Sequence, residues 1–215
     1  MKTTILQALF GFFFTSSLLS LNENNPWLTP RVIFVYTSTI CYNSFTRRTI
    51  MTTEIHTADD LLRHLYGDNI QLPIDVWRIA EKLGIVAMSG EIEDKNVSAV
   101  IYKKDAPKPF RAVINSDESH IRRRLIVAHV IGHYIQLYQD LPADKIAGIV
   151  DYRDAFSSMQ TNPREVAANH FALSLLMPER ELLKLWGKGY LFEDIADEFR
   201  VSRSTLATRL KMLNL

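Results

Sequence analysis

The sequence holds a single cysteine, Cys41, among 215 residues. One thiol excludes a disulfide framework within the chain, and it equally excludes a metal cluster built from several thiolates. Internal repeats and low-complexity tracts are also absent. Apolar residues make up 47% of the chain, a share that at this length suggests one or two soluble domains.

An excess of charge of one sign is lacking too, because 25 basic residues face 24 acidic ones and the net charge is +1. The first fifty residues carry four basic residues and one acidic residue, a net +3, which leaves the rest of the chain at −2. The chain after residue 50 is therefore not generally basic. This argues against broad nucleic-acid binding through a positive surface, though not against a local patch.

Residues 1–50 form an apolar N-terminal extension whose main feature is the run Ile5–Leu21. This run fits a signal peptide or a short membrane anchor, and only as an anchor would it attach the chain to a membrane. No small-x-small cleavage site stands out after it. We favour a third interpretation, in which translation begins at Met51 and the protein is cytoplasmic, because a helix N-cap and a fresh domain start follow that methionine.

After Met51 the pattern predicts an α+β fold, with one domain at 51–180 and a helix-turn-helix-like segment at 181–215. Helical spacing and short β-branched runs predict two helices, with Gly84 ending the second, and then a small twisted sheet. Residues 115–117 are expected to cap a helix that runs to about Tyr138. The predicted helices are Asp59–Tyr66 and Ile74–Leu83, and the predicted strands are Ile85–Met88, Val97–Tyr102 and Arg111–Ile114.

His129 and His133 lie four residues apart on this last helix, in the run Ala-His-Val-Ile-Gly-His. Residues at this spacing share one helix face, about 6 Å apart along the axis, so both imidazoles can reach one ion. A zinc protease has glutamate after the first histidine, in the motif H-E-x-x-H, and this chain has Val130 there. The pair alone leaves a metal site and a hydrogen-bonded pair of core histidines as even alternatives.

A third ligand is available in the segment Pro163–Pro178. Proline suits the first turn of a helix and stops one at its end, so this segment predicts a helix with Glu165 and Asn169 one turn apart on one face. Catalytic zinc sites usually take three protein ligands, and Glu165 is a candidate for the third. The alternative is an ordinary first-turn carboxylate that the helix dipole favours.

Several sequence blocks resemble the ImmA/IrrE metallopeptidases and follow one another in the same order. They cover nearly everything after Met51, so the resemblance implies a metallopeptidase-like domain at 51–180. The resemblance implies a zincin-like metal helix, one Zn²⁺ held by His129, His133 and Glu165, and Asn169 beside the ligands. The matching blocks are Leu72–Ile85, Arg124–His133, Val150–Asp154, Glu165–Ala172 and Leu176–Pro178.

Val130 stands where the family has its catalytic glutamate. That carboxylate takes a proton from zinc-bound water and returns it to the leaving amine, and valine can do neither. Losing a general base costs about 10²- to 10⁴-fold in rate, so we expect a zinc-binding protein with impaired or absent peptidase activity. Similar proteins cleave helix-turn-helix repressors of mobile elements or stress genes, so the expected partner is such a repressor. The alternative is an active zinc endopeptidase that uses an unrecognised base.

The C-terminal segment resembles a helix-turn-helix, with Arg203 and Arg209 as candidate DNA contacts in its second helix. Against DNA binding, Arg200 stands where the turn usually has glycine, and the first helix carries four carboxylates that would repel phosphates. We favour a helical hairpin that packs on the metal-binding domain, with DNA binding through 191–215 as the minority alternative.

Overall fold

The computed structural model describes residues 55–102, 110–138, 149–152 and 163–215. The predicted extension 1–50, with Cys41 and the apolar run, and the predicted start at Met51 lie outside the described residues. None of the helices in the described ranges combines the length and the apolar character that crossing a bilayer requires.

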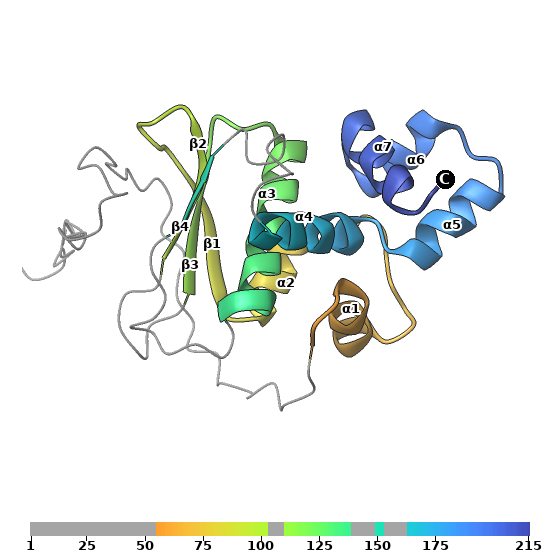
Figure 1. Ribbon diagram of the computed structural model, residues 1–215, viewed down its shortest axis with the longest axis horizontal. Coiled ribbons are helices and arrows are strands. Elements are labelled where there is room, and N and C mark those ends of the chain that lie inside the picture. Colours follow the sequence, from red (N-terminus) through yellow and green to blue (C-terminus); the bar gives the residue numbers. More distant parts are fainter. Residues whose placement is uncertain (1–54, 103–109, 139–148, 153–162) are drawn as a thin grey trace, which may run out of the picture. The chain divides into compact units, whose positions relative to one another are not determined.

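The α+β prediction is confirmed. A four-stranded mixed sheet has the helices packed on one side of it (Figure 1). The strands are β1 (Ile85–Gly90), β2 (Val97–Tyr102), β3 (Phe110–Asn115) and β4 (Ile149–Tyr152). The α-helices are α1 (Ala58–Tyr66), α2 (Val76–Lys82), α3 (His120–His133), α4 (Pro163–Leu176), α5 (Glu179–Gly187), α6 (Phe192–Phe199) and α7 (Arg203–Met212).

The two helices before the sheet begin and end where local chemistry predicts. Thr57 and Asp60 form a reciprocal capping box on α1, and Asp75 accepts a hydrogen bond from the backbone N–H of Arg78 at the start of α2. Gly84 follows α2 with φ +75°, a conformation that L side chains rarely adopt. The prediction that Gly84 ends this helix is confirmed.

The sheet has the order β1-β3-β2-β4, with β1 parallel to β3 and the other two pairs antiparallel. Side chains alternate across it, as strand geometry requires. Ala112 and Ile114 belong to the main hydrophobic core with the helices, whereas Val113 joins a small cluster with Ile92 and Val97. All three predicted strands are confirmed, each within two residues of its predicted ends.

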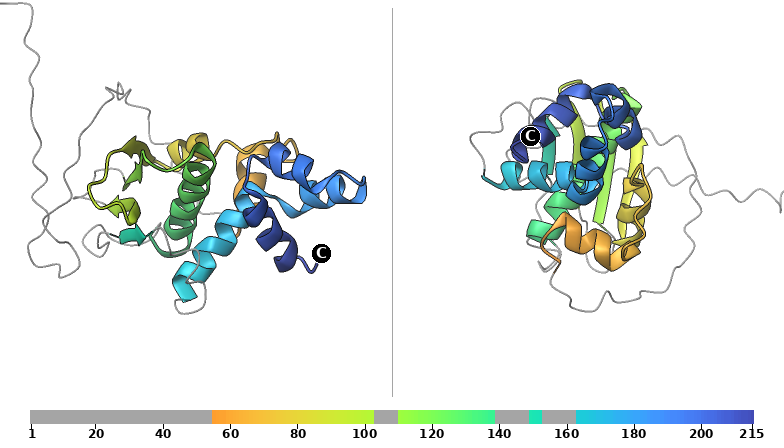
Figure 2. Two further views of the ribbon diagram at one scale, coloured as in Figure 1. Left: turned by 90° about the horizontal axis from the view of Figure 1, so that it is seen from above. Right: turned by 90° about the vertical axis from the view of Figure 1, so that its right-hand side faces the viewer.

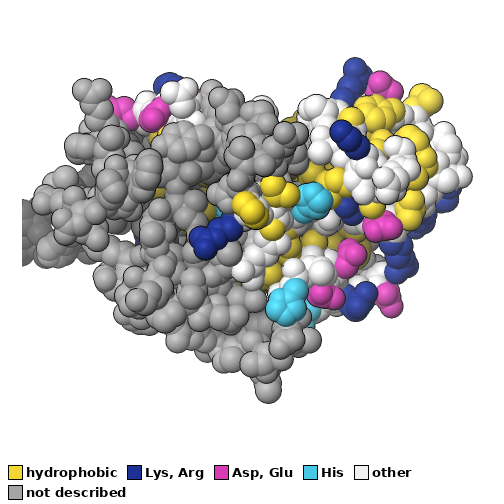
Figure 3. Space-filling model, in the orientation of Figure 1, with side chains coloured by type: hydrophobic (Ala, Val, Ile, Leu, Met, Phe, Trp, Pro, Cys, Tyr) yellow, Lys and Arg dark blue, Asp and Glu magenta, His cyan; other side chains and the backbone are white. Residues whose placement is uncertain are grey.

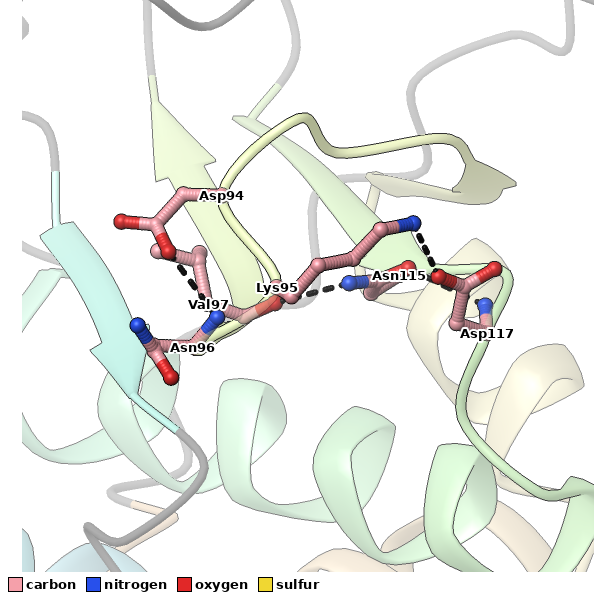
Figure 4. A network of polar contacts seen from close by, with 6 residues as sticks. All are labelled: Asp94, Lys95, Asn96, Val97, Asn115 and Asp117. Carbon is pink, nitrogen blue, oxygen red and sulfur yellow. Dashed lines mark hydrogen bonds and ion pairs between the residues drawn. The ribbon is translucent and has the colours of Figure 1, made fainter.

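The start of α3 differs from the prediction. Its N-cap is Ser119, whose hydroxyl accepts from the N–H of Arg122 at 3.2 Å, so the expectation that residues 115–117 cap the helix is wrong. Through side-chain contacts, Asn115 and Asp117 instead hold the end of β3 against the start of β2 (Figure 4). The amide of Asn115 donates to the Val97 carbonyl at 3.0 Å and accepts from the N–H of Asp117, and Asp117 pairs with Lys95.

Glu118 also lies before α3, and it accepts a hydrogen bond from Ser98 at 2.7 Å. This contact and the Asn115 contacts fix the direction in which α3 leaves the sheet. The α-helix ends at His133, but the chain continues in a π-helical turn, η1 (Tyr134–Tyr138), so the helical path does extend to Tyr138 as predicted.

The helices after residue 163 share the main core with α3. Buried side chains on α6 and α7 belong to the same hydrophobic cluster as Leu125, and α7 contacts α4. Arg200 has the left-handed conformation that the tight turn between α6 and α7 requires, with φ 50°. The core residues of this hairpin are Ile195, Phe199, Leu206 and Leu210.

Candidate metal centre

The two histidines lie on the most buried stretch of α3. Every residue from Arg124 to His133 is buried, which explains why this helix lacks one clear polar face. His129 is 0% exposed and His133 is 2% exposed. Their Nε2 atoms are 2.9 Å apart and the rings are perpendicular, so both nitrogens point to one place.

Glu165 reaches the same place from the first turn of α4, which packs against α3 (Figure 2). Its Oε2 lies 3.2 Å from the Nε2 of His129 and 3.4 Å from the Nε2 of His133. The carboxylate is 26% exposed, so it also borders solvent while both rings are enclosed. The three predicted ligand residues are therefore brought together by two helices.

This donor set fits a divalent metal ion. Donor atoms about 2.1 Å from an ion in tetrahedral geometry lie about 3.4 Å from one another, and the three measured separations are 2.9, 3.2 and 3.4 Å. In the described part of the chain this is the one group of three such side chains whose ligand atoms converge. The residues are positioned to bind a metal, with the exposed side of Glu165 toward solvent.

Hydrogen bonds from His129, and then from His133, hold the pKa of the Glu165 carboxyl well below its ordinary range, against the opposing effect of burial. The carboxylate form is therefore favoured in this position. An ionised carboxylate and imidazole nitrogens are the forms in which these side chains ligate a cation.

Val130 is 0% exposed and packs in the main hydrophobic core with Val127 and Ile131. The side chain that follows the first ligand is therefore apolar and enclosed. It has no atom that can accept or donate a proton.

Asn169 lies one turn after Glu165 on α4 and is 0% exposed. Neither of its amide polar atoms has a hydrogen-bond partner among the described residues. Asn169 therefore lies on a buried side of the helix that supplies Glu165, and its place beside the ligands stays a prediction.

A groove of about 670 Å³ runs along another side of α4 and does not include the three ligands. Helical spacing puts its α4 residues nearly opposite Glu165. We regard the convergence of donor atoms, and not the size of this groove, as the mark of the chemical site. The groove is lined in part by His56, Gln136, Val166 and His170.

The two candidate DNA contacts have different environments. Arg209 is 5% exposed and its Nε donates to the Met177 carbonyl at 3.2 Å, so this side chain is not available to a DNA backbone. Arg203 is 72% exposed and lies 3.7 Å from Glu193. The burial of Arg209 and its backbone partner argue against a DNA contact by this side chain, whereas Arg203 is exposed.

Sequence reasoning did not single out Arg124, which is 6% exposed and whose Nη2 donates to the Phe199 carbonyl at 3.4 Å. Burial lowers the pKa of both Arg124 and Arg209. The two arginines thus join the hairpin to α3 and to the end of α4. The one signal in the sequence is that Arg124 begins an otherwise apolar stretch of helix.

A search of curated proteins finds no match to this chain. The family model Peptidase_M78, described as the IrrE N-terminal-like domain, matches residues 80–211. This range includes α3 and α4, which carry the candidate metal ligands, and extends through α5 and α6 into α7. The match covers more than half of the chain, and the protein therefore belongs to the Peptidase_M78 family of IrrE N-terminal-like metallopeptidases.

Proposed function

We propose that this protein binds one Zn²⁺ through His129, His133 and Glu165, binds a helix-turn-helix repressor, and cleaves it poorly or not at all. The observation that carries the proposal is the combination of a converged ligand set with Val130 at the position of the general base.

Zinc is favoured by the donor set. Two imidazole nitrogens and one carboxylate are a common protein ligand set of catalytic zinc, which keeps a fourth position for water or substrate. The partial exposure of Glu165 supports such an open position. When bound, the ion supplies Lewis-acid polarisation of a substrate carbonyl.

Among the described residues that form the site, none is placed as a general base. The carboxylate of Glu165 contacts both histidines, and Val130 has no group that can take up or release a proton. Without a general base the expected loss is about 10²- to 10⁴-fold in rate. Binding does not need that proton transfer, so a partner can bind in the site and be released uncut.

The partner proposal rests on the family. Similar proteins cleave helix-turn-helix repressors, and a chain that keeps the ligands but lacks the base can regulate a repressor by binding it. We propose that the protein acts in the cytoplasm, where such a repressor works.

The test compares wild type with Val130→Glu, using a helix-turn-helix repressor from the same genome as substrate. We expect wild type to bind the repressor, and Val130→Glu to raise its cleavage rate by about 10²- to 10⁴-fold because the carboxylate restores the base. The matched control is Val130→Gln, which introduces a polar side chain of the same length that cannot take up the proton.

A gain in Val130→Glu that Val130→Gln lacks supports the missing-base proposal. Rapid cleavage by wild type, unchanged in Val130→Glu, would establish the alternative of an active endopeptidase with another base. Wild type that neither binds nor cuts the repressor would remove the repressor from the proposal while leaving the metal site to its own test.

A further inference from the structure

The helices that carry the metal ligands approach each other unusually closely at Gly132. A Cβ atom built on Gly132 lies 2.9 Å from the Ala168 carbonyl oxygen and 3.2 Å from the Ala168 Cα. Ordinary contacts of this kind begin at 3.4 Å. Because the facing atoms are backbone, a side chain at 132 can be accommodated only if α4 moves away from α3.

Three buried alanines on the two helices accompany Gly132, and the Phe171 Cβ also lies 3.2 Å from the built Cβ atom. Ala128 stands four residues before Gly132, and Ala168 and Ala172 stand four apart on α4; all three alanines are 0% exposed. Small residues at this spacing let two helix backbones approach one another. At Gly132 the backbone of α4 lies too close to leave room for a Cβ atom.

A second contact holds the peptide unit of α4 that immediately precedes the Ala168 carbonyl. Gln136, in η1, donates from Nε2 to the Ala167 carbonyl at 3.3 Å. Residues 132 and 136 thus contact two successive residues of α4, Ala168 and Ala167. These two follow Glu165 by only three and two positions, less than one helical turn.

We propose that Gly132 and Gln136 are positioning residues that set the crossing of α3 and α4 and thereby hold the Glu165 carboxylate at the metal. This inference rests on the proposed metal site. Restoring an ordinary contact at Gly132 requires α4 to move by about 0.5 Å, the difference between 2.9 and 3.4 Å. Metal–ligand distances tolerate about 0.2 Å, so this movement takes the carboxylate out of range while both histidines stay on α3.

The experiment measures metal affinity and the Co²⁺ absorption spectrum of the full chain as wild type, Gly132→Ala and Gly187→Ala. Gly187 is the matched control, because it is also helical but its added Cβ would meet nothing within 4 Å. We expect Gly132→Ala to bind at least about tenfold more weakly, the range seen when residues that orient ligands are mutated. Its Co²⁺ bands should shift as the carboxylate is lost, and Gly187→Ala should match wild type.

Gln136→Met provides a second variant in case Gly132→Ala does not fold, since Gln136 is exposed and methionine keeps its length without the donor. We expect a smaller loss of affinity in the same direction. Wild-type affinity and spectrum in both variants, or in Gln136→Met when Gly132→Ala is unfolded, would overturn this inference alone. A wild-type chain that binds no metal would overturn the metal site and the inference together.

Discussion

The pair α3–α4 and the pair α6–α7 each carry a recognisable functional motif, yet they use buried polar side chains in opposite ways. In α3–α4, two imidazole nitrogens and a carboxylate face one another across 2.9 to 3.4 Å. In α6–α7, the buried Arg209 donates to the Met177 carbonyl. A motif side chain can serve a ligand only where the fold has not already given it a backbone partner.

The surface of the second pair fits the same conclusion. The C-terminal helices show both basic and acidic side chains on the face drawn in Figure 3, among many apolar ones. On α6 the four carboxylates Glu193, Asp194, Asp197 and Glu198 are all exposed. On the face drawn, basic and acidic side chains are mixed, and the exposed carboxylates of α6 oppose binding to a phosphate backbone.

The largest effect should come from removing a ligand. We expect His133→Ala to weaken metal binding by more than about 100-fold, because losing a ligand exceeds the usual effect of mutating an outer partner. Competition with a chromophoric chelator measures the affinity. The control is His170→Ala, which removes an exposed histidine from α4 outside the ligand set; equal affinities in the two variants would show that His133 is no ligand.

Removing the buried arginine should affect folding instead of ligand binding. We expect Arg209→Met to lower the free energy of unfolding by about 2 kcal/mol, because the Met177 carbonyl loses a charged donor in a buried place. Urea unfolding checks the value. If stability stays unchanged while binding to DNA falls, Arg209 is a contact residue and the comparison between the two helix pairs is wrong.

A smaller loss is expected at the start of α7. The Ser202 hydroxyl accepts from the N–H of Thr205 at 3.1 Å, and Ser202→Ala should cost about 1 kcal/mol as the loss of an N-cap. Metal affinity should remain at the wild-type value, since Ser202 lies outside the ligand helices. A parallel loss of metal affinity would show that the hairpin controls the metal site.

The smallest effect is expected from Arg203→Ala. Its partner Glu193 is 3.7 Å away and 52% exposed, so the pair should contribute less than about 0.5 kcal/mol. Thermal unfolding measures this. A mobility-shift assay with DNA completes the test, and a shift that disappears on Arg203→Ala would restore the DNA-binding alternative.

Most elements were predictable because local patterns determine them. Runs of β-branched residues predicted the strands, and the glycine at position 84 predicted the end of α2. In the structure Gly84 has the positive φ that favours glycine there. The cap of α3 was not, because Asn115, Asp117 and Ser119 are all suitable capping residues. Which of them caps depends on Asn115 reaching Val97 in another strand, a contact that local sequence does not contain.

The convergence of the three candidate ligands was predictable from the sequence, but the contacts that support them were not. Histidines four residues apart must share a helix face, and the helix predicted after Pro163 offered Glu165, which the resemblance also indicated. The roles of Gly132 and Arg209 depend on where α4 and the carbonyl of Met177 lie after folding. An arginine in a helix is ordinarily a surface residue, so its burial follows from tertiary packing alone.

We expect the chain to keep a metal centre whose ligands are His129, His133 and Glu165. The most direct measurement is anomalous diffraction at the zinc absorption edge from crystals of the wild-type protein grown with stoichiometric Zn²⁺. We expect one strong peak about 2.1 Å from both Nε2 atoms and from a carboxylate oxygen of Glu165. A zinc peak elsewhere, or no peak between α3 and α4, would contradict it.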